Sequence, residues 1–238
     1  MSAARNRFYK DVSVDAVAGE KPLHRVLLDG KPVKTPGGAF LALPTEALAQ
    51  TIAEEWRAQE KTIRPETMFL TKLANTAIDR VAPNPQAAKQ QILAFARSDV
   101  VCYRADAPSG LVERQEQHWD PLIAWLQERF GARFQTATGL TFVAQDEAAI
   151  GALDRALSGL DAFTLAALAA AASLCGSLIV PLALSERLLD PETAFAIANL
   201  DKVYQAERWG WDEQDSAKAA IERDELNQIS RFLELLTK

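Results

Sequence analysis

The feature of this sequence that most constrains its fold is residues 162–185, a run of 24 positions without a charged side chain. A helix of that length could span a bilayer. The composition argues against a span, because eight of these residues are alanine and Ser173, Gly176, Ser177 and Pro181 interrupt the run. No cluster of lysine or arginine flanks it, as would be usual beside a membrane helix. We therefore expect a buried central helix and no stable membrane insertion.

The charge balance and the scarcity of cysteine and histidine exclude several classes of function. The chain has 26 basic and 32 acidic residues, a net charge of −6, so it has no general attraction to nucleic acid. Two cysteines and two histidines are too few for a zinc site made of cysteine or for most histidine-based active sites. The G-x-x-x-x-G-K-[ST] and G-x-G-x-x-G signatures are missing, so we expect no bound nucleotide, no cofactor and no metal.

Cys102 and His118 are the one thiol–imidazole pair that could support nucleophilic catalysis. Cys102 lies in the apolar stretch SDVVCYR, where a cysteine is usually a small core residue. His118 precedes Trp119 in a segment that is expected to be an exposed helix. Neither residue has the supporting groups that an active site needs, so we assign no catalytic residue and expect the protein not to be an enzyme.

The N-terminal part of the chain is expected to form a small β-rich domain, residues 1–62, that ends in an amphipathic helix. Asp29-Gly30 between two extended runs is a strong signal for a β-hairpin. After Thr45, a plausible N-cap, the apolar residues Leu48 and Ile52 are spaced four apart, as on one face of a helix. Trp56 continues that stripe, so we predict that it is a structural residue that packs where this helix meets the rest of the fold.

The remainder, residues 63–238, is predicted to be mainly helical, which places the protein in the α+β class. The segment 112–131 is expected to form two short helices, broken before Pro121 and stopped at Gly131. Strands within 130–145 are expected to return to the N-terminal sheet. The segment 190–210 is expected to form one helix between a cap at Asp190-Pro191 and a stop at Gly210.

A polar stripe follows the predicted helix 66–81. Thr67, Thr71, Asn75 and Asp79 are spaced four apart, and none has a long charged side chain. A solvated face is the default interpretation. The alternative is a hydrogen-bonding patch for a partner, because short polar side chains without long charges are unusual on a purely solvating face. We keep Thr71, Asn75 and Asp79 as candidate partner contacts.

The segment 201–215 combines five acids and two bases with three large aromatic side chains. Trp209 and Trp211 flank a glycine and are followed by Asp212 and Glu213, a composition that resembles an interaction hot spot. We expect one tryptophan to close the core, and we assign the tryptophans and the acids to partner binding. Glu207 is the preferred contact, because a negative charge in the last turn of a helix is against local preference.

The sequence resembles the assembly chaperones of the F-type ATP synthase head, which hold the unassembled alpha subunit. The stretches that carry this resemblance are RFYKDVSV, LDGKPVKTP, PTEALAQTIAEEWRAQ, IRPETMFLTKLANTAID, SDVVCYR, LVERQEQHWDPLIAW and LDKVYQAERWGWDE. The resemblance implies a chaperone without catalytic activity. It would bind free alpha subunit, shield the surface that later meets a beta subunit, and release it during assembly. Eukaryotic members of the family act in the mitochondrial matrix.

Two alternatives from other classes remain open. One is a small-molecule enzyme with its pocket between the β-rich and the helical domain. The other is a membrane-associated assembly factor that uses residues 162–185. The N-terminal text MSAARNRFYKDVSV has no apolar leader, so we expect a bacterial cytoplasmic protein or a processed form.

Overall fold

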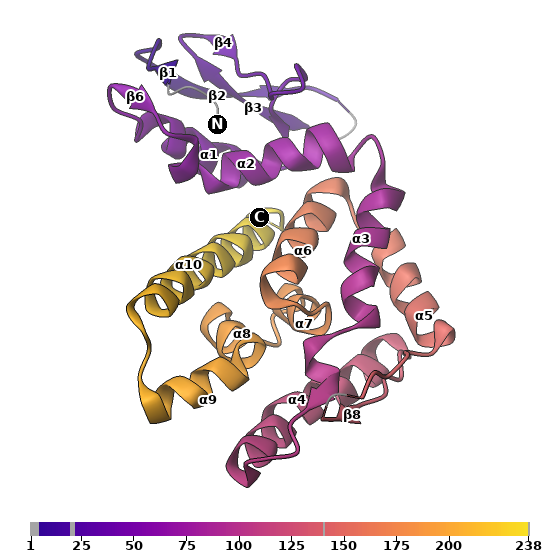
Figure 1. Ribbon diagram of the computed structural model, residues 1–238. Coiled ribbons are helices and arrows are strands. Elements are labelled where there is room, and N and C mark those ends of the chain that lie inside the picture. Colours follow the sequence, from indigo (N-terminus) through magenta and orange to yellow (C-terminus); the bar gives the residue numbers. More distant parts are fainter. Residues whose placement is uncertain (1–4, 20–21, 140, 238) are drawn as a thin grey trace. The chain divides into compact units, whose positions relative to one another are not determined.

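The computed structural model of the protein describes residues 5–19, 22–139 and 141–237. Its class is α+β, as predicted, with a small N-terminal sheet followed by helices (Figure 1). The chain divides into two compact units. The described residues of Met1–Pro85, Asp161–Ala167 and Arg231–Lys238 form the first unit, and those of Gln86–Leu160 and Leu168–Ser230 form the second. The first unit therefore extends beyond the expected boundary at residue 62 and includes two later segments.

The first unit is built from short strands and two main helices. Its elements are β1 (Arg5–Asn6), β2 (Val12–Val17), β3 (Leu23–Leu28), β4 (Lys31–Pro32), β5 (Ala42–Leu43), α1 (Glu46–Arg57), β6 (Thr62–Ile63), a 3-10 turn (Pro65–Thr67), α2 (Phe69–Thr76) and a π-helical turn (Ala77–Val81).

The strand β3 is central to the main sheet of this unit. It pairs antiparallel with β2 on one side and with both β4 and β5 on the other. The predicted hairpin is confirmed, because Asp29 and Gly30 both have positive φ angles, 48° and 75°, between β3 and β4. Two consecutive residues with positive φ give the tight turn whose twist matches that of the flanking strands.

The helix α1 covers this sheet by contacting β2 and β3 (Figure 1). The predicted cap is confirmed: the Thr45 hydroxyl accepts the backbone N–H of Leu48 at 3.2 Å, and it donates to the carbonyl of Leu235 at 2.7 Å. Leu48 and Ile52 are completely buried, as their spacing predicted. The apolar face of α1 and the sheet together form the core of the first unit.

The rest of the chain is almost entirely helical. Its elements are α3 (Pro85–Arg97), a 3-10 turn (Val100–Cys102), β7 (Tyr103–Arg104), α4 (Ser109–Phe130), β8 (Ala137–Thr138), α5 (Glu147–Ser158), α6 (Ala162–Cys175), α7 (Ile179–Ser185), α8 (Pro191–Ala198), α9 (Leu200–Trp209) and α10 (Glu213–Leu235).

Two of the helix predictions for this region are wrong in opposite ways. The segment 112–131 belongs to one helix, α4, which continues through Pro121 and ends at the left-handed Gly131. Pro121 removes one backbone hydrogen bond, but Trp119 and Leu122 are buried on either side of it, so packing holds the helix together. The segment 190–210 is two helices, because Asn199 leaves helical geometry, with φ −111° and ψ 24°, between α8 and α9.

The uncharged run and the expected strands also differ from prediction. Residues 162–185 form two helices, α6 and α7, since Gly176 adopts a positive φ of 59° between them. In the described part of the chain, no helix is both long and apolar enough to cross a bilayer. The strand β8 pairs in parallel with β7 and does not return to the N-terminal sheet.

Candidate partner-binding surface

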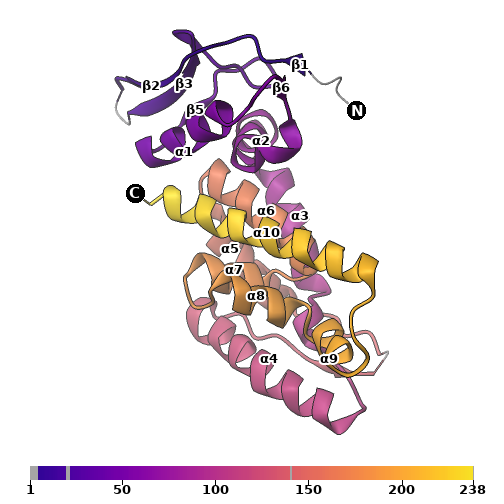
Figure 2. The same cartoon turned by 90° about the vertical axis from the view of Figure 1, so that its left-hand side faces the viewer.

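Helix α9 lies within the second unit, where it contacts α4 and α8 (Figure 2). Leu200 and Tyr204, one turn apart, are its buried residues. Two further bonds hold the neighbouring helices: the indole N–H of Trp119 in α4 donates to the carbonyl of Ile197 at 3.0 Å, and the side-chain amide of Gln115 donates to Asp201 at 2.8 Å. The position of α9 is therefore set by α4, which precedes it by many residues.

The end of α9 presents the two predicted tryptophans to solvent. Trp209 is 78% exposed and Trp211 is 41% exposed. The expectation that one of them closes the core is wrong, because the core positions of α9 are already filled by Leu200 and Tyr204. Gly210 separates the tryptophans with a φ of 79° and ends the helix. The glycine allows the chain to turn without the steric cost that a side chain would add there.

A shallow hollow of about 360 Å³ lies beside this turn and includes both tryptophans, Lys202 and Asp212 in its lining. The Asp212 carboxylate accepts the backbone N–H of Asp215 at 2.8 Å, which caps the start of α10. This hydrogen bond lowers the pKa of Asp212, so its side chain is charged at neutral pH. Glu213 is exposed in the first turn of α10. Aromatic and acidic groups therefore share one exposed edge.

Glu207 has an ionic partner within the chain that sequence reasoning missed. Its carboxylate lies 2.7 Å from Nη1 of Arg114 in α4. The argument that Glu207 has no internal reason for its position is therefore wrong, although its side chain remains half exposed. The guanidinium groups of Arg114 and Arg208 also lie over the ring of Tyr204, at 5.3 and 3.6 Å from its centre. Arg114 gave no local signal, because its partners follow it by about 90 residues.

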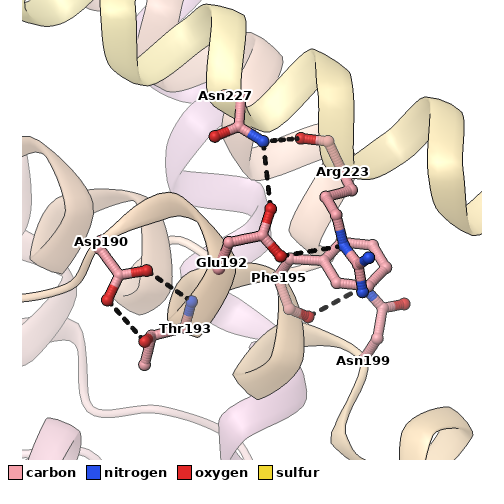
Figure 3. Close-up of polar contacts among 7 residues, drawn as sticks. All are labelled: Asp190, Glu192, Thr193, Phe195, Asn199, Arg223 and Asn227. Atoms are coloured by element: carbon pink, nitrogen blue, oxygen red, sulfur yellow. Dashed lines mark hydrogen bonds and ion pairs between the residues drawn. The ribbon is translucent and has the colours of Figure 1, made fainter.

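A second hollow, of about 610 Å³, opens between α4, α8 and α9 with Glu207 and Arg114 in its lining. Glu192, another lining residue, is fixed by α10: its carboxylate lies 3.1 Å from Nε of Arg223 and accepts the side-chain amide of Asn227 at 3.3 Å (Figure 3). The predicted cap of α8 is confirmed, because Asp190 accepts the backbone N–H of Thr193 (Figure 3). These bonds hold the wall of the hollow in place.

Thr71 and Asp79 of the polar stripe form hydrogen bonds within the first unit. The hydroxyl of Thr71 donates to Oε2 of the Glu55 carboxylate at 2.6 Å. The backbone N–H of Thr71 donates to the same oxygen. Asp79 accepts the hydroxyl of Thr35 at 2.6 Å and the backbone N–H of Gly37 at 2.8 Å. Asn75 is half buried. A partner role for these three residues stays a prediction, but Thr71 and Asp79 each have a structural role.

Trp56 is half buried and packs edge-on against Tyr9, with 5.8 Å between ring centres. The Tyr9 hydroxyl donates to the Trp56 carbonyl at 2.7 Å, so the N-terminal segment is tied to the end of α1. Glu55 directly precedes Trp56 in the sequence, and burial raises the pKa of the Glu55 carboxyl group. This part of the first unit therefore depends on close packing around the end of α1.

Cys102 and His118, the thiol–imidazole pair, differ in exposure. Cys102 is completely buried, and burial raises the pKa of its thiol to about 12, which keeps it protonated at neutral pH. His118 is exposed on α4. Within the described residues, no group of three or more histidine, cysteine or acidic side chains is arranged to hold a metal ion.

The chain is similar to several known proteins. Residues 6–127 match the family model described as ATP12 chaperone protein. The mitochondrial protein atp12 of Schizosaccharomyces pombe is 28% identical over 217 residues, which cover 86% of this chain and 73% of that protein. The crystal structure of Atp12 from Paracoccus denitrificans is 40% identical, with a TM-score of 0.90 over 98% of both chains. A candidate chaperone from Agrobacterium tumefaciens is 39% identical, with a TM-score of 0.89 over 98% of this chain and 87% of that one.

Proposed function

The chain belongs to the ATP12 chaperone family, and from that membership we propose that it assists assembly of the F-type ATP synthase head by binding the unassembled alpha subunit. In this proposal it is not an ATPase: it occupies the surface of the alpha subunit that later meets a beta subunit, and it is then displaced. We place this activity in the bacterial cytoplasm.

The observation that supports this proposal most directly is the exposed edge formed by Trp209, Trp211, Asp212 and Glu213. Large aromatic side chains are the commonest anchors of protein interfaces, whereas a tryptophan that is 78% exposed contributes little to its own fold. The acids beside the tryptophans provide a polar rim that favours a basic partner surface. A few anchors with a charged rim suit a partner that must be released.

Release is the physical requirement that favours a small interface. A chaperone that bound as tightly as a permanent subunit would block the beta subunit from taking its place. The binding energy is therefore expected to depend on two or three side chains, with the acids contributing mainly to the rate of encounter. Removal of the tryptophans should weaken binding strongly, while a rise in salt concentration should slow association.

The test uses purified full-length protein and isolated alpha subunit, with binding measured by isothermal titration calorimetry in the absence of nucleotide. A Trp209→Ala/Trp211→Ala double variant should bind about 30-fold more weakly or worse, as expected for the loss of hot-spot side chains. The matched control is Phe142→Ala, since Phe142 is 71% exposed elsewhere in the second unit. Normal binding by the double variant would contradict the proposal, as would an equal loss in the control.

A second measurement addresses displacement. Added beta subunit should release the chaperone from its complex with the alpha subunit, as followed by size-exclusion chromatography. A stable complex of all three proteins would show that the chaperone and the beta subunit occupy different surfaces, which contradicts this part of the proposal.

A further inference from the structure

A hollow of about 580 Å³ in the first unit is lined by aromatic side chains that the surface around α9 does not include. Phe8 and Tyr9 pack edge-on with 5.4 Å between ring centres, and Tyr9 packs against Trp56 in the same way. Phe8 is 60% exposed, so it faces the hollow from the solvent side. The hydrogen bond from the Tyr9 hydroxyl to the backbone carbonyl of Trp56 fixes the Tyr9 ring, against which the Trp56 ring packs. A rigid aromatic wall binds an apolar side chain at low entropic cost.

The rim of this hollow is basic, which contrasts with the net charge of −6 of the whole chain. Lys31 and Lys34, at and just after β4, line it and are exposed. Among the residues that the structure describes, neither lysine has a carboxylate within ion-pair distance. The Lys34 ammonium lies over the ring of Phe40, 5.6 Å from its centre, where its flexible stem leaves it free to turn toward a ligand.

The acid in the lining, Asp29, cancels only part of this positive charge. Asp29 turns its carboxylate toward the backbone, because Oδ1 accepts the N–H groups of Lys10 and Asp11 at 3.0 and 2.8 Å. These hydrogen bonds lower the pKa of Asp29, so its carboxylate stays charged but is directed toward the backbone. The lining therefore carries two lysine ammonium groups against one carboxylate, an excess of positive charge.

We propose that this hollow binds an extended acidic peptide segment of a partner protein. A large apolar side chain of the segment would lie against Phe8, Tyr9 and Trp56, while neighbouring aspartate or glutamate carboxylates would pair with Lys31 and Lys34. Aromatic-lined grooves are a common way to bind extended chains, and the two lysines select for acidic flanks. The inference does not depend on the alpha subunit being the partner of the acidic edge at α9.

The indole N–H of Trp56 provides a local signal for the test. It is buried and has no hydrogen-bond partner among the described residues. Its NMR resonance, assigned by its absence in Trp56→Phe, should therefore respond to any group that enters the hollow. The probe is the peptide acetyl-Gly-Ser-Pro-Leu-Pro-Asp-Asp-Ser-Gly-amide, with two versions that carry phenylalanine or methionine in place of leucine. Full-length protein labelled with nitrogen-15 is used throughout.

The expected result is a saturable shift of the Trp56 indole resonance with at least one acidic peptide. Replacement of both peptide aspartates by lysine should weaken binding about tenfold or more, and so should the Lys31→Glu/Lys34→Glu variant. The control is Lys72→Glu, an exposed lysine on α2 in the same unit, which should bind as the unmodified protein does.

Several results would overturn the inference. These are the absence of a saturable shift with all three acidic peptides, equal binding of the lysine peptides, and unchanged binding by the double lysine variant. Binding of acetyl-aspartate as tightly as the peptides would instead show a small-anion site. Peptide binding that survives in the Trp209→Ala/Trp211→Ala variant would separate this site from the surface proposed for the alpha subunit.

Discussion

The carboxylate of Glu207 in α9 lies 2.7 Å from Nη1 of Arg114 in α4, and 93 residues separate the two in the sequence. The pair lies beside the ring of Tyr204, which is itself buried. Both members are partly exposed, so the pair contributes only about 0.2–1 kcal/mol to stability. This relationship means that a change at Glu207 affects the α4–α9 contact as well as any partner.

The first prediction uses this pair to separate the two roles of Glu207. Glu207→Lys should lower the free energy of unfolding by about 1 kcal/mol, because it places two positive charges together, and it should weaken alpha-subunit binding. The exchanged variant, Arg114→Glu/Glu207→Arg, should recover the melting temperature of the unmodified protein, because it restores an ion pair in which the acid and the base have changed places. Binding is then measured by calorimetry with both variants.

The exchanged variant decides the outcome. If Glu207 contacts the partner, binding stays weak although the fold is restored. If binding recovers together with the melting temperature, then Glu207 acts only through Arg114. Glu213→Lys serves as the comparison at the exposed edge of Trp209 and Trp211; because it leaves the Arg114–Glu207 pair intact, it should lower the melting temperature less than Glu207→Lys.

The second prediction concerns Trp56. Trp56→Arg removes the packing against Tyr9 and forces a guanidinium beside the end of α1, which should cost about 2–4 kcal/mol. Against a total stability of about 5–15 kcal/mol, that loss should lower the melting temperature clearly or make the protein insoluble. The matched control is Trp209→Arg, since Trp209 is 78% exposed, and its thermal melt should be unchanged. Equal melting curves for Trp56→Arg and the unmodified protein would disprove a structural role.

The third prediction concerns the pH dependence of stability. Asp99 is completely buried, and it accepts the backbone N–H groups of Val101, Leu178 and Ile179. Burial raises its pKa from 3.8 to about 6, although these donors oppose the change. Between about pH 4 and 6 the folded state therefore keeps a proton that the unfolded state has lost. The contribution of Asp99 is present in full below pH 4 and is lost as the pH rises to 6, a total of about 3 kcal/mol.

Chemical denaturation of the unmodified protein and Asp99→Asn at pH 4.5 and 7 checks this prediction. The stability difference between the two should favour the unmodified protein by about 2 kcal/mol more at pH 4.5 than at pH 7. Asp190→Asn is the control of opposite sign, because its hydrogen bonds to Thr193 lower the pKa of Asp190. A difference for Asp99→Asn that is independent of pH, or that grows with pH, contradicts the prediction.

The fourth prediction tests the structural role of Asp79. A Cβ atom at Gly37 would lie 2.7 Å from Cγ and Oδ1 of Asp79, so Gly37→Ala must displace that carboxylate. The displaced carboxylate loses its bonds to Thr35 and Gly37, which should cost about 1–3 kcal/mol in urea denaturation. Gly159→Ala is the control, since nothing lies within 4 Å of a Cβ there, and it should be neutral or slightly stabilising. A neutral Gly37→Ala would show that the contact tolerates the change.

Several parts of the fold could be predicted from the sequence because their causes lie within a few residues. The Asp29-Gly30 turn, the Thr45 cap of α1 and the Gly131 end of α4 each depend on backbone geometry that one or two neighbouring residues decide. The apolar spacing of Leu48 and Ile52 likewise identified the buried face of α1. The sequence also indicates directly that acidic and aromatic residues are concentrated around Trp209.

The tertiary structure alone decided which of those residues are exposed and which are already bonded. Local preference predicts a break at Pro121, yet buried neighbours on both sides keep α4 continuous, because packing energy exceeds the loss of one hydrogen bond. The sequence is compatible with Trp209 in the core, but Leu200 and Tyr204 are the buried residues of α9. The partners of Glu207 and Asp79 are 93 and 42–44 residues away, and contacts at such separations arise only when the folded chain brings distant segments together.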